Sequence, residues 1–295
     1  MTRRSGYVAL LGRPNVGKST LLNRLLAQKI SITAPKPQTT RHAILGIRTL
    51  PETQIVYVDT PGLHRHARRA MNRYMNRTAS SVLSYVDVVV LMTAAPRWTD
   101  EDEAALSRLA DYQGPVLLAV NKVDLVADKT RLLPLLQALS GKRRFAEIIP
   151  ISAQAGTNLA ALETAIAALL PEAEFLFPED QVTTASERFL AAELIREKLT
   201  RYLRQELPYA LTVEIERFQD ADQRLNIDAV IWVERPGQKA IIIGSQGAVL
   251  KTIGRQARED MEKIFDRRVY LRTWVKVREG WSDDERALRS LGYGQ

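Results

Sequence analysis

The sequence contains no cysteine, and this absence excludes a disulfide framework and any thiolate metal site. It also lacks a run of the ~18 consecutive apolar residues that a membrane span requires. The apolar run at residues 7–11 is too short for the core of a signal peptide, and Arg13 follows it directly. The lack of cysteine fits a reducing compartment. Together with the other two absences, it leads us to expect a globular protein located in the cytoplasm.

Short apolar runs alternate with helical patterns through the first half of the chain. The predicted strands lie at residues 7–11, 43–50, 55–58, 86–92, 116–120 and 148–151. Runs that are apolar on both faces indicate a buried parallel sheet, and the short turn between 43–50 and 55–58 indicates one antiparallel edge. The fold class is therefore α/β, with a doubly wound, mostly parallel sheet that binds ligands at the carboxyl ends of its strands.

A break in the pattern separates this domain from a smaller one. The stretch PEAEFLFPEDQ holds two prolines and several acids, which is typical of a linker. We therefore expect a nucleotide-binding domain at 1–172, a linker at 173–185 and an α+β domain at 186–295, with the order α-β-β-α-α-β. Lys and Arg far outnumber Asp and Glu between residues 235 and 278, as contact with a phosphate backbone would require. A solvated helix face would explain the same excess.

The stretch GRPNVGKS, Gly12 to Ser19, matches the phosphate-loop pattern and lies between a predicted strand and a predicted helix. Its glycines let the backbone curl around phosphates at the positive end of the helix. Lys18 is expected to reach the β- and γ-phosphates, and the Ser19 hydroxyl to bind Mg²⁺. The nucleotide-binding residues predicted here are Gly12, Asn15, Val16, Gly17, Lys18, Ser19 and Thr20.

The stretch DTPG, residues 59–62, directly follows the predicted strand at 55–58. Asp59 can hold the magnesium through a water, and the amide of Gly62 can contact the γ-phosphate. The next residue is Leu63, where many GTPases carry a glutamine that orients the attacking water. An arginine-rich run from Arg65 to Arg77 follows, and it is open to two interpretations: a solvated switch face, or a surface that contacts RNA or the ribosome.

Base specificity is predicted at NKVD, after the strand at 116–120. The carboxylate of Asp124 can accept two hydrogen bonds from guanine, whereas adenine would leave this charge unpaired. Asn121 can bond the edge of the base, and Lys122 can lie across the ring. Ser152 and Ala153 close the pocket with a backbone amide for the guanine oxygen. The nucleotide is therefore expected to be GTP or GDP.

Taken in order, GRPNVGKST, PQTTR, DTPG, NKVD and SA resemble a translation-factor-class GTPase of the Era, Der and tRNA-modifying group. The resemblance implies that Thr40 in PQTTR closes over Mg²⁺ in the GTP state, and that a hydrophobic residue at Leu63 is normal. It also implies K⁺ as a further cofactor, held in part by Asn15. On this basis Lys18, Thr40 and Gly62 are the predicted catalytic residues, and Ser19, Thr40 and Asp59 the predicted metal ligands.

A second motif, G-x-x-G, lies in GSQG between two predicted helices. The predicted RNA-binding residues are Gly244, Ser245, Gln246, Gly247 and Lys251. The setting resembles a KH domain of the bacterial topology, whose G-x-x-G loop clamps about four single-stranded nucleotides. Residues 241–243 and Val249 are expected to form an apolar floor beneath the bases.

This pairing of domains is similar to the Era family over nearly the whole chain. It implies a slow GTPase that binds the 3′ end of small-subunit ribosomal RNA and the 30S subunit, assists its maturation, and works as a monomer. Peripheral association with the inner face of the cell membrane is compatible with this. GTP is expected to order the loops at Thr40 and Gly62 and thereby alter the KH surface. Two alternatives remain: a tRNA-modifying GTPase, which would often carry a C-terminal cysteine, and an RNA-binding module with a vestigial nucleotide site.

Overall fold

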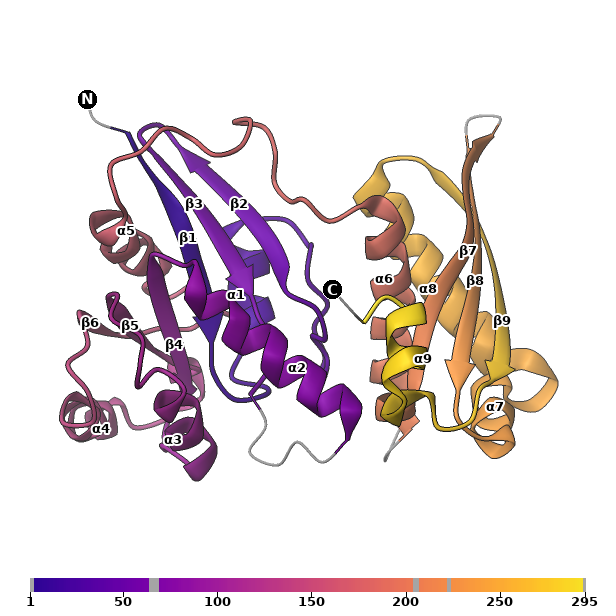
Figure 1. Cartoon of the computed structure of the whole chain (residues 1–295), viewed down its shortest axis with the longest axis horizontal. Coiled ribbons are helices and arrows are strands. Elements are labelled where there is room, and N and C mark those ends of the chain that lie inside the picture. Colours follow the sequence, from indigo (N-terminus) through magenta and orange to yellow (C-terminus); the bar gives the residue numbers. More distant parts are fainter. Residues whose placement is uncertain (1–2, 64–68, 204–206, 222–223, 294–295) are drawn as a thin grey trace. The chain divides into compact units, whose positions relative to one another are not determined.

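A computed structural model of the chain describes residues 3–63, 69–203, 207–221 and 224–293 (Figure 1). These residues form two compact units. The first unit comprises Met1–Ser31, Thr40–Ala67 and Met75–Thr184. The second comprises Ile32–Thr39, Arg68–Tyr74 and Ala185–Gln295. Two short segments from the first half of the sequence therefore belong to the second unit.

The first unit is built on a six-stranded sheet with the order β2-β3-β1-β4-β5-β6. Its strands are β1 (Arg4–Leu11), β2 (Ile44–Leu50), β3 (Thr53–Asp59), β4 (Val88–Ala94), β5 (Val116–Asn121) and β6 (Glu147–Pro150). The edge strand β2 runs antiparallel to β3, and the other neighbours are parallel. This confirms the predicted fold class and its antiparallel edge.

The strands of this sheet are apolar on both faces because helices cover them. All seven residues of β4 and all six of β5 are buried. The helices of this part of the chain are α1 (Lys18–Leu25), α2 (Ala70–Ser81), α3 (Asp100–Ser107), α4 (Leu132–Ser140) and α5 (Leu159–Leu169). Strands β1, β3, β5 and β6 are parallel, so their carboxyl ends meet at one edge of the sheet. Four of the five nucleotide motifs follow these ends, and PQTTR precedes β2.

The segment predicted as a linker continues the first unit as far as Thr184. Its last residues bond to the edge strand β2: the Ile47 N–H donates to the Val182 carbonyl at 2.7 Å, and the Thr183 hydroxyl donates to the Leu45 carbonyl at 2.6 Å. A sequence rich in proline and acid indicates a lack of regular structure. Such a sequence does not show that the free edge of β2 will take hydrogen-bond partners from this segment.

The second unit has the predicted order α-β-β-α-α-β. Its elements are α6 (Glu187–Tyr202), β7 (Leu211–Ala221), β8 (Arg224–Val233), α7 (Pro236–Ile243), α8 (Ala248–Phe265), β9 (Arg268–Val277) and α9 (Glu285–Ser290). The sheet has the order β7-β8-β9, with β8 antiparallel to β7 and parallel to β9. Figure 1 shows α6 and α8 side by side on one face of this sheet.

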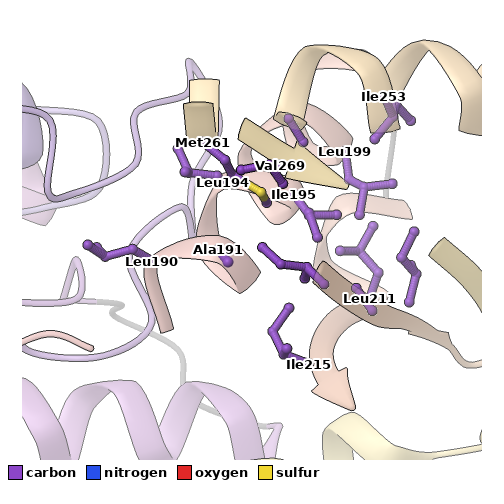
Figure 2. Close-up of a cluster of buried hydrophobic side chains, with 14 of the residues drawn as sticks. Leu190, Ala191, Leu194, Ile195, Leu199, Leu211, Ile215, Ile253, Met261 and Val269 are labelled. Carbon is purple, nitrogen blue, oxygen red and sulfur yellow. The ribbon is translucent and has the colours of Figure 1, made fainter. Parts of the chain in front are cut away.

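The core of the second unit lies between these two helices and the sheet (Figure 2). Leu194 and Ile195 of α6 meet Ile253 and Met261 of α8 there, beside Leu211 of β7. Every second residue of β8, from Leu225 to Val233, points into this core. No helix in the described part of the chain is long and apolar enough to cross a membrane.

Candidate nucleotide and RNA sites

The phosphate loop joins the end of β1 to the start of α1 through backbone conformations that few residues adopt. Gly12, Asn15 and Gly17 all have positive φ angles, of 149°, 62° and 105°. A Cβ added at Gly17 would lie 2.4 Å from Nδ2 of Asn121, so both the backbone angle and the neighbouring side chain require glycine. Gly17 caps α1 without a side-chain hydrogen bond, which leaves the first amides of the helix available to an anion.

Lys18 is curled back over this loop and is almost fully buried. Its Nζ donates to the carbonyl oxygens of Gly12, at 3.1 Å, and Arg13, at 3.2 Å. Burial lowers the pKa of Lys18 to about 8, while the negative charge of Asp59 opposes this shift. Phosphate oxygens at the same place would supply the negative charge that a buried ammonium lacks.

Three side chains converge beside Lys18, and they are the three predicted metal ligands. The Ser19 hydroxyl donates to Oδ2 of Asp59 at 2.6 Å and lies 2.8 Å from Oγ1 of Thr40. Oδ1 of Asp59 is buried and has no hydrogen-bond partner among the described residues. Burial raises the pKa of Asp59, and the charge of Lys18 and the neighbouring hydroxyls lower it.

This oxygen-rich corner fits Mg²⁺, because Mg²⁺ prefers oxygen ligands and is usually held by one or two carboxylates and by substrate phosphates. A bound cation would also satisfy the orphaned oxygen of Asp59. The described residues contain no group of three His, Cys, Asp or Glu that could hold a metal by themselves. The remaining ligands must therefore be hydroxyls, water and nucleotide.

Ser31 is a neighbour of this corner that the sequence analysis missed. Its hydroxyl donates to Oδ2 of Asp59 at 2.8 Å, and it is fully buried. The side chain of Asn23 holds the segment in place by accepting from the Ser31 amide at 2.9 Å. Ser31 lies in no recognised motif, so the sequence carried no signal for it.

The base-recognition motif is bound directly to the phosphate loop. Nδ2 of Asn121 donates to the Val16 carbonyl at 2.7 Å, and Oδ1 of Asn121 accepts from the Ala153 amide at 2.9 Å. Nζ of Lys122 donates to the Asn15 carbonyl at 2.7 Å. In this structure Asn121 therefore joins three motifs, and one of the two backbone amides of Ser152 and Ala153, the Ala153 amide, bonds Asn121.

Asp124 and Ser152 complete this end of the site. Asp124 lies in the short helix η2 (Val123–Leu125), and this residue is exposed. Its carboxylate is therefore accessible to a base that enters from solution. Ser152 is fully buried, and its Oγ accepts from the Ala155 amide at 3.0 Å. The Ser152 hydroxyl thus stabilises the loop after β6, which carries Ala153.

A further ion pair on the phosphate loop was also missed. Nε of Arg13 donates to both carboxylate oxygens of Asp102, at 3.0 and 3.1 Å. Asp102 is almost fully buried and forms a capping box with Thr99 at the start of α3. This charge-assisted pair, in which one N–H is shared between two oxygens of a buried carboxylate, holds Arg13 in place. Arg13 occupies a variable place in the phosphate-loop pattern, so the motif does not indicate its role.

Leu63 packs in the hydrophobic core of the first unit and is only 6% exposed. Its amide donates to the Gly12 carbonyl at 3.3 Å. A Cβ added at the preceding Gly62 would lie 2.8 Å from Cα of Pro14, so the backbone here packs against the phosphate loop. The side chain at Leu63 is therefore structural. His64, Arg65 and the following residues up to Arg68 lie outside the described residues.

The G-x-x-G loop of the second unit lies between α7 and α8, as predicted. Gly244, Gln246 and Gly247 have positive φ angles, of 71°, 51° and 78°. A Cβ added at Gly244 would lie 2.4 Å from Cγ2 of Val249, whereas one added at Gly247 would meet no described atom within 4 Å. Gly244 is thus favoured by its backbone angle and by packing, and Gly247 by its backbone angle alone.

Side chains around this loop are exposed where a ligand could reach them. Ser245, Gln246 and Lys251 are exposed, and Ile241 is 56% exposed. The predicted apolar floor needs one correction: Ile242 is fully buried in the core. On a helix, neighbouring residues point to different sides, so three consecutive isoleucines cannot all face a ligand.

The comparisons with known proteins match both domains. The sequence matches the family described as 50S ribosome-binding GTPase over residues 7–122, and the KH domain family over residues 206–282. It is 59% identical to GTPase Era of Pseudomonas syringae pv. syringae over 291 residues, which covers 99% of this chain and 97% of the relative. The chain belongs to the Era family of GTPases.

GTPase Era of Pseudomonas aeruginosa is 60% identical over 291 residues, which covers 99% of this chain and 95% of the relative. Two solved structures resemble the chain over 99% of its length at 39% identity, and both are covered completely. One is a Tyr-to-Ala variant of Aquifex aeolicus Era bound to GDP and aluminium fluoride, with a TM-score of 0.96. The other is an Era in complex with MgGDPNP and nucleotides 1506–1542 of 16S ribosomal RNA, with a TM-score of 0.95. These full-length matches favour the Era prediction over the tRNA-modifying alternative.

Proposed function

We propose that the chain binds GTP with Mg²⁺ and hydrolyses it to GDP and phosphate. The observation that carries this proposal is the convergence of Ser19 and Thr40 on Asp59, whose second carboxylate oxygen is buried without a hydrogen-bond partner in the described part of the chain. Bound magnesium would bridge phosphate oxygens and offset their developing charge. Lys18 and the first amides of α1 bind the β- and γ-phosphates, and the Gly62 amide contacts the γ-phosphate. A structure of an Era with MgGDPNP supports this assignment.

Intrinsic turnover should be slow, because no side chain at residue 63 can accept a proton. Leu63 is held in the core, so the attacking water must be placed by backbone groups, ions or a partner. We propose K⁺ as one of these ions, near Asn15. Asn15 is exposed and has a left-handed backbone on the phosphate loop.

The second activity that we infer is binding of the 3′ end of small-subunit ribosomal RNA by the KH domain. We infer that this binding promotes maturation of the 30S subunit. The support is the relative solved with nucleotides 1506–1542 of 16S ribosomal RNA. In this chain Gly244 to Gly247 and Lys251 offer the exposed loop and cation that a phosphate backbone would contact. An assembly factor of this kind works in the cytoplasm; its monomeric state and its peripheral association with the inner face of the membrane stay predictions.

Two assays test these proposals. Phosphate release from GTP should depend on Mg²⁺ and should be faster in potassium than in sodium buffer. A fluorescent RNA with the sequence of nucleotides 1506–1542 should bind more tightly than an RNA with the reversed sequence. If no phosphate is released in either buffer, the GTPase proposal fails, and equal affinity for the two RNAs would refute recognition of this sequence.

A further inference from the structure

Helix α6 carries a stripe of polar side chains that are buried, although the helix belongs to the RNA-binding module. The stripe consists of Glu193, Arg196, Glu197 and Thr200, each at most 5% exposed. Their spacing of three and four residues places them on one face of the helix. A buried charge is strongly unfavourable unless it is paired, so the stripe must have partners that match it.

One partner is the backbone of the segment that contains Thr39. The guanidinium of Arg196 pairs with both oxygens of Glu193, at 2.7 and 2.6 Å. Its remaining donors bond the carbonyl oxygens of Gln38, at 3.4 Å, and Thr39. A lysine could not make these contacts together, because only arginine presents several donors in one rigid plane.

The stripe holds the same segment at a second point, near its start. Oε1 of Glu197 accepts from the Thr33 amide at 2.9 Å, and Arg201 bonds both the carbonyl and the hydroxyl of Thr33 at 2.9 Å. Nζ of Lys36 donates to the Thr200 carbonyl at 2.7 Å. Residues 33–39 are therefore fixed to α6 at both ends and in the middle.

This anchoring matters because Thr40 follows Thr39 directly. Thr40 Oγ1 lies 2.8 Å from Ser19 Oγ at the predicted metal corner. Consecutive Cα atoms are about 3.8 Å apart, so a fixed carbonyl at Thr39 leaves Thr40 little freedom. The Thr39 hydroxyl also donates to the Lys36 carbonyl at 2.7 Å, which stiffens the turn between the anchors.

We propose that Arg196, held by Glu193, is a positioning residue for GTP hydrolysis: it fixes residues 33–39 so that Thr40 meets the metal and the γ-phosphate. This rests on the GTPase proposal above. It extends that proposal by making the first helix of the RNA-binding module a part of the nucleotide switch. In this proposal Arg196 acts through the backbone of Gln38 and Thr39 and is not itself a ligand of nucleotide or metal.

The proposal predicts an effect that depends on the nucleotide. Thr40 is expected to close over Mg²⁺ only when a γ-phosphate is bound. Arg196→Lys should therefore weaken binding of GDPNP about tenfold relative to binding of GDP. Turnover of GTP at saturation should fall by a similar factor. A purely structural role for Arg196 would lower both affinities together, or neither.

Two further variants keep the test valid if Arg196→Lys does not fold. Arg201→Ala removes the two Arg201 bonds to Thr33 but keeps the Glu197 bond to the Thr33 amide. It leaves the buried Arg196–Glu193 pair intact, since Arg201 is 49% exposed. It should reduce the ratio of GDPNP to GDP affinity by a few-fold. Arg267→Ala is the control, because Arg267 pairs with Glu187 and Asp220 and lies outside this anchoring stripe.

Circular dichroism establishes which variants are folded before nucleotide affinities are compared. A lower ratio in Arg196→Lys or Arg201→Ala, with a normal ratio in Arg267→Ala, supports the proposal. Wild-type ratios and turnover in the folded anchor variants overturn it. A wild-type chain that releases no phosphate would instead refute the GTPase proposal, so the two failures are distinguishable.

Discussion

The chain has two glycine loops that each open a helix, and they are built in opposite ways. The phosphate loop is bonded to its own unit through Lys18, Asn121 and Lys122, and a Cβ at Gly17 would meet Asn121. The loop from Gly244 to Gly247 is largely exposed, and a Cβ at Gly247 would meet no described atom within 4 Å.

This difference indicates how each loop recognises its ligand. The phosphate loop is preorganised: its shape is fixed by neighbouring motifs, so a small anion finds its donors already in place. The G-x-x-G loop offers space and an exposed cation, Lys251, to a polymer that brings many weak contacts. Single changes should therefore have large effects in the first loop and small effects in the second.

The largest effect is expected for Gly17→Ala. The residue has a φ angle of 105°, and its new methyl group would lie 2.4 Å from Asn121 Nδ2. Affinity for GTP and GDP should fall roughly a thousandfold, since backbone strain at residue 17 adds to the steric clash with Asn121. Titration with a fluorescent nucleotide measures this. Gly247→Ala is the matched control and should bind GTP as the wild type does; a similar loss there would break the comparison.

The next largest effect concerns the base. Asp124→Asn replaces a carboxylate that is predicted to accept two hydrogen bonds from guanine by an amide that can accept only one. Affinity for GTP should fall about a hundredfold, and xanthosine triphosphate should become the preferred nucleotide. Competition between the two nucleotides measures the change. Unchanged GTP affinity in this variant would refute the assignment of Asp124.

A moderate effect on stability, without loss of chemistry, is expected for Leu63→Ala. The side chain is buried in the core, so its truncation should lower the free energy of unfolding by about 2 to 3 kcal/mol. Turnover per folded molecule should change little, because the side chain cannot take part in proton transfer. Denaturant unfolding and phosphate release measure the two quantities. Complete loss of turnover with normal GTP binding would reveal a role for Leu63 beyond packing.

The smallest effect is expected at the exposed loop. Lys251→Ala removes one cation, so RNA affinity should fall only about three- to fivefold, and the slope of log affinity against log salt should decrease by about 0.7. GTP turnover without RNA should not change. Fluorescence anisotropy at several salt concentrations gives both values. Arg131→Ala, an exposed cation of the first unit, should leave RNA binding unaltered.

Much of the fold could be predicted because its signals are local. Buried strands such as β4 and β5 are continuous apolar runs, and four of the five nucleotide motifs follow a strand end. The order of elements in the second unit also follows from periodicity. By contrast, the contacts of Ser31 and Asp102 could not be predicted, since each joins residues far apart in sequence and lies outside the motifs.

The sequence by itself determined the two domains and the residue types at their ligand sites, because motif spacing and hydrophobic periodicity depend only on neighbours along the chain. Only the tertiary structure decided which module holds the segment before Thr40. Residues 32–39 belong to the second unit because the buried stripe around Arg196 needs carbonyl and amide partners, and this segment supplies them. The bonds between Arg196 of α6 and the backbone of Gln38 and Thr39, some 160 residues away, leave no pattern in the sequence. In our proposal these bonds limit the freedom of Thr40.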